Sequence, residues 1–335
     1  MTHNFADRPV RVAVIGAGKM GRNHLRVYET LKNVDLVGFY DPDPHTSHTL
    51  VEQFGYRAFS SLEEVLGNVD AVSVCTPSST HGKVGTFFLD AGVHCLMEKP
   101  LATTEEEGLA LIAAAKRSGA KLLVGHIERF NPAVQQVALL LDGPHSIHAI
   151  EAHRLSSVSK RITDVDVVAD LMVHDLDIVT ALLSSSVTSL NVAAVQTQDS
   201  SGSDHVTALL RFENATIANL TASRITQNTV RKLSITTDAG LVNVDYINQS
   251  IEIYRQDTVR ITEGRVSKFG DYALDISMER VLVRRAEPLQ LELSHFIGMI
   301  CSDIAPLVTG EQGLAVMKLV WAIQDNIRKQ RETKE

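Results

Sequence analysis

The sequence predicts an α/β protein whose first part is a doubly wound parallel sheet and whose second part is an α/β domain with a large, mainly antiparallel open sheet. Two observations support this division. Up to residue 124, short β-branched runs alternate with longer amphipathic segments, an order typical of parallel strands joined by helices. After Phe130, strands follow one another with short turns, and such strands pair antiparallel because parallel strands need a long crossover. We therefore expect a first domain at residues 1–126 and a second at 127–335, whose last helices could pack back on the first.

The first domain alternates five strands with five helices. The strands are apolar at nearly every position, as in sheets buried on both faces: Val10–Ile15, Val34–Tyr40, Val69–Val74, Val93–Met97 and Lys121–Val124. The segments between them have apolar residues at helical spacing: Met20–Leu31, His45–Phe54, Ser61–Leu66, His81–Ala91 and Thr104–Arg117. Two starts have the spacing of a capping box, Ser61 with Glu64 and Thr103 with Glu106.

The second domain begins with a helix from Asn131-Pro132 to Leu141 and continues with another at Asp170–Leu183. Two strand pairs follow with turn residues between them: Val206–Phe212 with Thr216–Ser223, and Lys232–Thr237 with Leu241–Tyr246. Helices near Leu289–Cys301 and Gln312–Lys329 close the chain. One strand carries apolar residues on both faces, namely Val206, Leu209, Leu210 and Phe212. One face would pack on helices and the other on a second subunit, so we expect a homodimer or homotetramer formed through this sheet.

Composition excludes several classes of protein. With 44% hydrophobic and 21% charged residues, the 335-residue chain is neither disordered nor fibrous, and its net charge of −8 argues against nucleic acid or an anionic membrane as the main partner. No apolar run approaches the ~20 residues of a membrane span, and no export signal is apparent, so we expect a cytoplasmic protein. Three scattered cysteines predict reduced thiols, and the histidines near residue 150 (His145, His148, His153) lack partners for a metal site, so none is expected.

A glycine motif follows the first strand. Gly16-Ala17-Gly18-Lys19-Met20-Gly21 fits G-x-G-x-x-G at the start of a helix, where backbone N–H groups can hold a pyrophosphate. Asp41 ends the second strand 20 residues after Gly21, the place of the carboxylate that binds the ribose hydroxyls of NAD. Its charge would repel the additional phosphate of NADP, and residues 42–45 offer no arginine or lysine. The sequence therefore predicts a Rossmann domain that binds NAD.

Further motifs lie at the carboxyl ends of the third and fourth strands, where open α/β sheets bind ligands. Thr76-Pro77 with His81 forms T-P-x-x-x-H, and Glu98-Lys99-Pro100 forms E-K-P. With Gly125–Pro132 (G-H-x-x-R-F-x-P) and Asp170–His174 (D-x-x-x-H), these motifs resemble the Gfo/Idh/MocA family of sugar and cyclitol oxidoreductases over nearly the whole chain.

That resemblance implies NAD(P)-dependent hydride transfer at a secondary alcohol, with Lys99, Asp170 and His174 as the polar catalytic trio. It also implies a cis peptide before Pro100. Residues expected along the cofactor groove are Thr76, Pro77, His81, Glu98, Lys99 and His126, together with the glycine motif and Asp41. His24, in the first helix, could line this groove or merely pack.

The chemistry of alcohol oxidation supports these roles. A base must take the hydroxyl proton, and histidine titrates near working pH. Asp170 and His174 are four residues apart and so share a helix face, where the carboxylate can orient the imidazole. Lys99 would donate to the same substrate oxygen from the other domain. The alternatives are a surface Asp–His pair, a surface lysine, or exchanged roles with Lys99 as the base; Asp177 could touch substrate, cap the helix or be solvated.

Two segments of the sequence, Val124–Pro132 and Arg161–Ile178, limit the range of possible substrates. They look like the branch of the family that oxidises the 3-hydroxyl of UDP-N-acetylglucosamine, although Ser156–Lys160 replaces a Gly-Pro-rich stretch of that branch. Arginine or lysine would bind a diphosphate, and the expected substrate residues are Arg129, Arg161, Lys99, Asp170 and His174, with Arg154 and Lys160 as further cations. Arg129 could instead form a hinge salt bridge. The alternatives are an inositol or free-hexose dehydrogenase, or a noncatalytic NAD-binding sensor or repressor.

Overall fold

The computed structural model describes residues 8–142, 146–157, 166–197, 202–257 and 275–332. The chain forms two compact units, one of residues 1–130 and 286–322, the other of residues 131–285 and 323–335. The first unit thus extends four residues beyond the expected boundary at 126 and includes a C-terminal segment. Among the described helices, none is long and apolar enough to cross a membrane.

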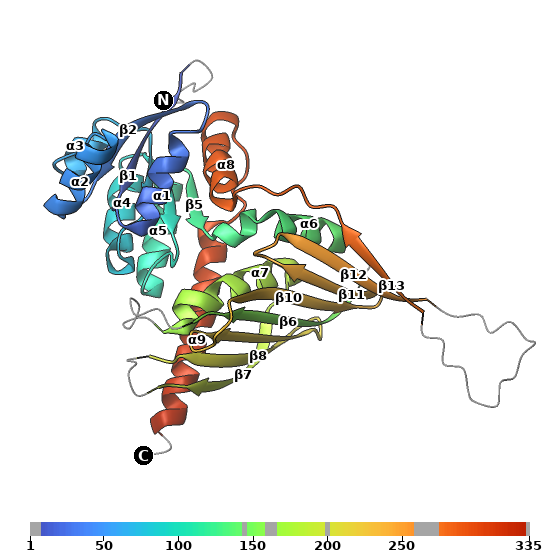
Figure 1. The fold of residues 1–335 in the computed structure, drawn as a ribbon. Helices are drawn as coiled ribbons and strands as arrows, with labels where there is room; N and C mark the ends of the chain where they lie inside the picture. Colours follow the sequence, from blue (N-terminus) through green and yellow to red (C-terminus); the bar gives the residue numbers. More distant parts are fainter. Residues whose placement is uncertain (1–7, 143–145, 158–165, 198–201, 258–274, 333–335) are drawn as a thin grey trace, which may run out of the picture. The chain divides into compact units, whose positions relative to one another are not determined.

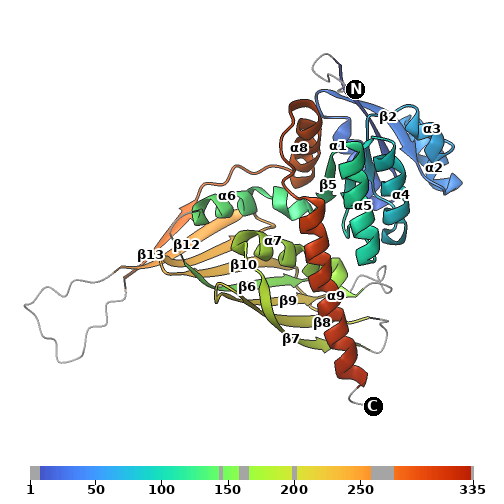
Figure 2. The same cartoon turned by 180° about the vertical axis from the view of Figure 1, so that it is seen from behind.

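The first unit contains a five-stranded parallel sheet in the order β2-β1-β3-β4-β5 (Figure 1). Its strands are β1 (Val10–Ile15), β2 (Val34–Tyr40), β3 (Ala71–Val74), β4 (His94–Glu98) and β5 (Leu122–Gly125). Its helices are α1 (Lys19–Tyr28), α2 (Pro44–Phe54), α3 (Leu62–Leu66), α4 (His81–Asp90), α5 (Glu105–Ser118) and α8 (Pro288–Ser302). Helices α1 and α8 pack together on one face of the sheet, and α4 packs with α5 on the other (Figures 1 and 2). The doubly wound parallel sheet is confirmed.

Helix capping was predicted correctly at α3 and one residue off at α5. Ser61 Oγ accepts the N–H of Glu64 at 3.2 Å, as expected. At α5, however, Thr104 is the N-cap and its hydroxyl accepts the N–H of Glu107, while the Glu107 carboxylate accepts from the Thr103 N–H at 3.0 Å. Thr103 and Thr104 are adjacent and each is followed three residues later by a glutamate, so spacing alone gives two equivalent registers.

The second unit contains an eight-stranded sheet in the order β13-β12-β11-β10-β6-β9-β8-β7. Its strands are β6 (Ile147–Leu155), β7 (Val187–Val195), β8 (His205–Phe212), β9 (Ile217–Ser223), β10 (Val230–Thr237), β11 (Gly240–Asp245), β12 (Ser250–Asp257) and β13 (Asp275–Val281). All neighbours pair antiparallel except β6 with β9, which pair parallel in the middle of the sheet. Helices α6 (Pro132–Leu141) and α7 (Val173–Leu183) lie on one face (Figure 2). Helix α9 (Gly310–Glu332) contributes its first part to the first unit and its last part to the second.

The strand that suggested a two-sided apolar sheet alternates cleanly instead. Val206, Leu210 and Phe212 of β8 are buried, whereas Leu209 on the opposite face is 44% exposed. The polar neighbours of Leu209 on that face are Thr207 and Arg211, which are half-buried and exposed. The premise of the oligomer prediction was therefore wrong for this strand, because three of its four apolar residues share one face.

Candidate active site

The glycine motif forms a tight turn between β1 and α1. Gly16 has φ +87°, and a Cβ there would lie 2.8 Å from the backbone of Cys75 and Thr76. A Cβ on Gly18, the N-cap of α1, would meet nothing within 4 Å, and no side chain caps the helix there. Gly18 and Lys19 are exposed and Met20 is half-buried. The turn therefore leaves open space in front of a helix N-terminus whose N–H groups can hold a pyrophosphate, so it fits a dinucleotide.

Asp41 lies directly beside this turn, at the end of β2. Its Oδ2 accepts the backbone N–H of Ala17 at 2.7 Å, and its Oδ1 accepts that of Asp43 at 2.9 Å. Asp41 is half-buried, so its carboxylate is oriented by the chain and still accessible. Each oxygen retains a lone pair for a hydroxyl donor.

The turn after β3 is held to the turn after β4 by a histidine. His81 is 1% exposed; its Nε2 lies 2.9 Å from the carbonyl oxygen of Thr76, and its Nδ1 lies 2.8 Å from that of Pro100. Thr76 is half-buried and Pro77 exposed. His81 was expected in the cofactor groove, but its ring nitrogens both contact the protein, so its role in the described structure is to hold the two loops together.

The E-K-P segment ends β4. The Lys99–Pro100 peptide is cis, as the family resemblance implied. Glu98 is 7% exposed and its carboxylate lies 2.9 Å from His24 Nε2. Burial acts to raise the pKa of Glu98, but the hydrogen bond and charge of His24, with the Lys99 ammonium, outweigh it and lower the pKa below its usual range. Glu98 is therefore a buried carboxylate.

His126 and Arg129 follow β5. His126 is 1% exposed, which makes it a buried histidine of the first unit. The Arg129 guanidinium donates to the carbonyl oxygen of Leu307 at 3.4 Å. This contact joins the two segments of the first unit, residues 1–130 and 286–322. Arg161 and Lys160 lie outside the described residues.

In the second unit, Asp170 lies in a π-helical turn (Val168–Met172) that leads into α7, and His174 is the second residue of α7. Both are half-buried, whereas Asp175 and Asp177 are 2% and 1% exposed. The single π turn is unusual, and such turns occur frequently at functional sites. Asp170 and His174 are thus the more accessible polar residues of this helix.

Arg154 was considered as a cation for a diphosphate, but it forms a buried ion pair. Its Nε and Nη2 donate to the two carboxylate oxygens of Asp175 at 2.9 and 3.0 Å, and its guanidinium lies 5.3 Å from the ring of Tyr246. Both members of the pair are 2% exposed. Sequence reasoning missed this pair, and the suggestion that Asp177 is solvated was wrong, because Asp177 is 1% exposed.

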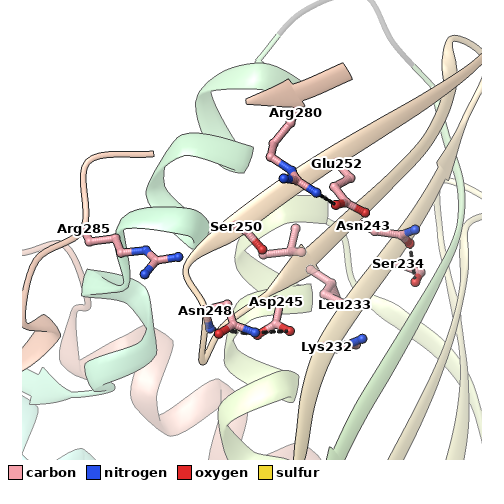
Figure 3. A pocket seen from close by; sticks show the side chains of 11 residues that line it. Lys232, Leu233, Ser234, Asn243, Asp245, Asn248, Ser250, Glu252, Arg280 and Arg285 are labelled. Atoms are coloured by element: carbon pink, nitrogen blue, oxygen red, sulfur yellow. Dashed lines mark hydrogen bonds and ion pairs between the residues drawn. The ribbon is translucent and has the colours of Figure 1, made fainter. Parts of the chain in front are cut away.

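A separate hollow of about 510 Å³ lies on the sheet of the second unit, lined by side chains of β10 to β13 (Figure 3). Arg280 forms an ion pair with Glu252 at 2.9 Å, and the hydroxyl of Ser234 donates to Asn243 Oδ1 at 2.7 Å. Lys232 also lines the hollow. This part of the sheet surface is therefore polar, in contrast to the apolar surface that the oligomer prediction assumed.

A Rossmann unit with a glycine turn, an ordered carboxylate after β2 and a cis Lys-Pro loop defines an NAD-binding oxidoreductase. Residues 10–126 match the model of the oxidoreductase family with an NAD-binding Rossmann fold, and residues 144–243 match the GFO/IDH/MocA C-terminal domain. The chain belongs to the Gfo/Idh/MocA family.

Known sugar and inositol dehydrogenases are among the proteins similar to the chain. The UDP-N-acetylglucosamine 3-dehydrogenase of Acidithiobacillus ferrooxidans is 33% identical over 299 residues, 88% of this chain and 92% of that protein. Its solved structure has a TM-score of 0.85 and covers 95% of this chain and 97% of that one. The inositol 2-dehydrogenase of Acidothermus cellulolyticus is 32% identical over 206 residues, 59% of this chain and 60% of that protein. The WlbA dehydrogenase of Bordetella pertussis, solved with NADH and UDP-GlcNAcA, shares the fold with 21% identity, a TM-score of 0.81 and 97% coverage of both chains.

Proposed function

We propose that this oxidoreductase oxidises a secondary alcohol of a nucleotide sugar, the 3-hydroxyl of UDP-N-acetylglucosamine or of a related UDP-sugar. The observation that carries the proposal is the 33% identity to a UDP-N-acetylglucosamine 3-dehydrogenase over 88% of the chain. Lys99, Asp170 and His174 are the residues that we propose for catalysis, and all three occur in the order and spacing of the family motifs.

His174 is the proposed general base. It takes the proton of the substrate hydroxyl, and Asp170 orients its imidazole and stabilises the imidazolium that forms. Lys99 donates to the same oxygen and offsets the negative charge that develops there. NAD, when bound at the glycine turn and Asp41, supplies the hydride acceptor. Arg129 and Arg161 are proposed to bind the substrate diphosphate.

The second candidate is an inositol or free-hexose dehydrogenase, supported by the 32% identity to an inositol 2-dehydrogenase. It would use the same trio without cations for a diphosphate. A noncatalytic NAD-binding sensor would bind NAD and oxidise none of these alcohols. Turnover therefore distinguishes a dehydrogenase from a sensor, and the substrate oxidised distinguishes a UDP-sugar dehydrogenase from an inositol or hexose dehydrogenase.

The test is a panel of UDP-sugars, hexoses and inositols assayed for NADH formation. We expect turnover with UDP-N-acetylglucosamine and a 3-keto product. His174→Ala and Lys99→Ala should each lose on the order of 10²–10⁴-fold in kcat, while exposed controls, His48→Ala and Lys116→Ala, should not. Oxidation of inositol alone would favour the second candidate, and no oxidation of any member would favour the sensor.

The competing assignment of the base is tested by pH. If His174 is the base, oxidation rises with pH through its titration, and His174→Gln removes this acidic limb. An unchanged acidic limb in His174→Gln would make Lys99 the proton acceptor.

A further inference from the structure

We propose that His24 is a positioning residue that acts through Glu98 to fix the backbone of Lys99. The proposal rests on the proposed function, because Lys99 is the lysine that we place at the reacting oxygen. His24 lies on α1, the helix that begins at the glycine turn, so the contact would connect the cofactor-binding helix to the catalytic loop.

Both oxygens of the Glu98 carboxylate are used within the first unit. His24 Nε2 lies 2.9 Å from Oε1, and the backbone N–H of Lys99 donates to Oε2 at 3.2 Å. Because Glu98 is ionised and can only accept, the His24 nitrogen at this contact carries the hydrogen. Two donors on two oxygens fix the plane of the carboxylate, and through it the first peptide of the Lys99–Pro100 loop.

The surroundings of the pair argue against a purely structural explanation. His24 is fully buried on the stripe of α1 that also carries Leu25 and Tyr28, where an apolar side chain would pack. A buried contact of this kind is weak evidence for stability, because desolvation of the carboxylate offsets the attraction and apolar replacements are often as stable. The position therefore calls for an explanation in terms of geometry, which the contact with Glu98 and Lys99 provides.

The same neighbourhood has the spacing of a metal site, since ligand atoms of His24, Cys75 and Glu98 lie within 4.8 Å of one another. The hydrogen bonds of Glu98 favour the positioning role, because its two carboxylate oxygens already contact His24 Nε2 and the Lys99 N–H.

The test compares two amides at one position. In His24→Gln the side-chain NH₂ can reach the place of Nε2, whereas in His24→Asn it reaches only the place of Nδ1. We expect His24→Asn to lose about 10- to 100-fold in kcat, the effect of one hydrogen bond to a charged group. KM for substrate and the Kd for NAD should stay within about threefold, and His24→Gln should recover most of the lost turnover. The control is His48→Asn, at an exposed histidine of α2.

A second measurement does not require activity. In a spectrum of protein labelled with ¹⁵N-lysine, the Lys99 amide signal, assigned by its loss in Lys99→Arg, should shift in His24→Asn and stay near its native position in His24→Gln. If the native protein oxidises no alcohol, the proposed function fails and this spectrum still tests the contact. The proposal is overturned if His24→Asn keeps native kcat and the native Lys99 signal, or if Asn and Gln lower Tm and kcat equally.

Discussion

The preference for NAD over NADP can be tested at Asp41. The adenosine ribose of NADP carries an additional phosphate, which would meet the carboxylate that Ala17 and Asp43 hold in place through their N–H groups. Two unit charges about 5 Å apart repel by about 3 kcal/mol at an effective dielectric constant of about 20. A free-energy difference of about 1.4 kcal/mol changes a binding constant tenfold. Because Asp41 is only half-buried, solvent and salt screen part of the repulsion, and we expect NAD to bind on the order of 10²-fold more tightly than NADP.

Two variants separate the charge of Asp41 from its support of the glycine turn. Asp41→Asn keeps an oxygen that can accept the Ala17 N–H, so the turn stays ordered while the repulsion disappears; the NAD preference should fall to about tenfold or less. Asp41→Ala also leaves the Ala17 N–H without this acceptor, so NAD affinity itself should fall by a further ~10-fold. Calorimetric titration of each protein with both dinucleotides measures these ratios. Equal or tighter binding of NADP by the native protein would refute the reasoning.

Three further predictions concern binding, stability and assembly. Gly18→Val should fold and lose NAD binding, because its side chain enters the open space in front of α1. Gly21→Ala should instead lower Tm, because its Cβ would lie 1.9 Å from the Gly16 carbonyl oxygen. Thermal melts with and without NAD distinguish the two variants, and native NAD affinity in Gly18→Val would exclude the turn as the binding site. The Asp70 carboxylate forms ion pairs with Arg8 at 2.6 Å and Arg11 at 2.9 Å, so Asp70→Asn should destabilise the fold by about 1–2 kcal/mol at neutral pH. Burial acts to raise the pKa of Asp70, but the hydrogen bonds from the two arginines outweigh it and hold the pKa well below its usual range. This stability is therefore present above the ordinary carboxyl pKa and lost as pH falls, and a difference between native and variant unfolding free energies that persists undiminished in acid would contradict the assignment. Although most apolar residues of β8 face the core, Leu209 and Ile217 are each 44% exposed on the outer face of the neighbouring strands β8 and β9, so we still expect a homodimer or homotetramer through this part of the sheet. Leu209→Arg should weaken the assembly in sedimentation, and a native monomer of 36.6 kDa at micromolar concentration would contradict the prediction.

The fold could be predicted where one periodicity decides it. Strand β3 is buried at all four positions, and it was recognised as a parallel strand because three of its four residues are apolar with no alternation between the two faces. The parallel pairing of β6 with β9 could not be predicted, because turn lengths constrain only strands that are consecutive in sequence. The insertion of β6 between β9 and β10 is set by long-range packing, which local spacing does not encode.

The placement of the candidate residues in the first unit was also largely predictable, because these residues follow strand ends. A parallel sheet brings the carboxyl ends of its strands to one edge, so Asp41, Thr76 and Glu98 could be assigned to that edge from sequence alone. The partner of Glu98 was less accessible to such reasoning. The available signal for His24 was a polar residue on the apolar stripe of α1, three residues after Gly21, and this indicates burial without identifying the partner.

The polar residues around α7 show why residue type alone does not assign a role. Asp170, Asp175 and Asp177 lie within eight residues, and spacing favoured Asp170 only through its distance from His174. In the structure Asp175 is fully buried and bound to Arg154 on β6, a partner 21 residues away in sequence. Its charge is thereby compensated within the protein, whereas Asp170 and His174 are half-buried on the same segment. The distinction between a structural and a catalytic carboxylate therefore depends on tertiary partners, and this is why we propose Asp170 rather than Asp175 as the carboxylate that acts with His174.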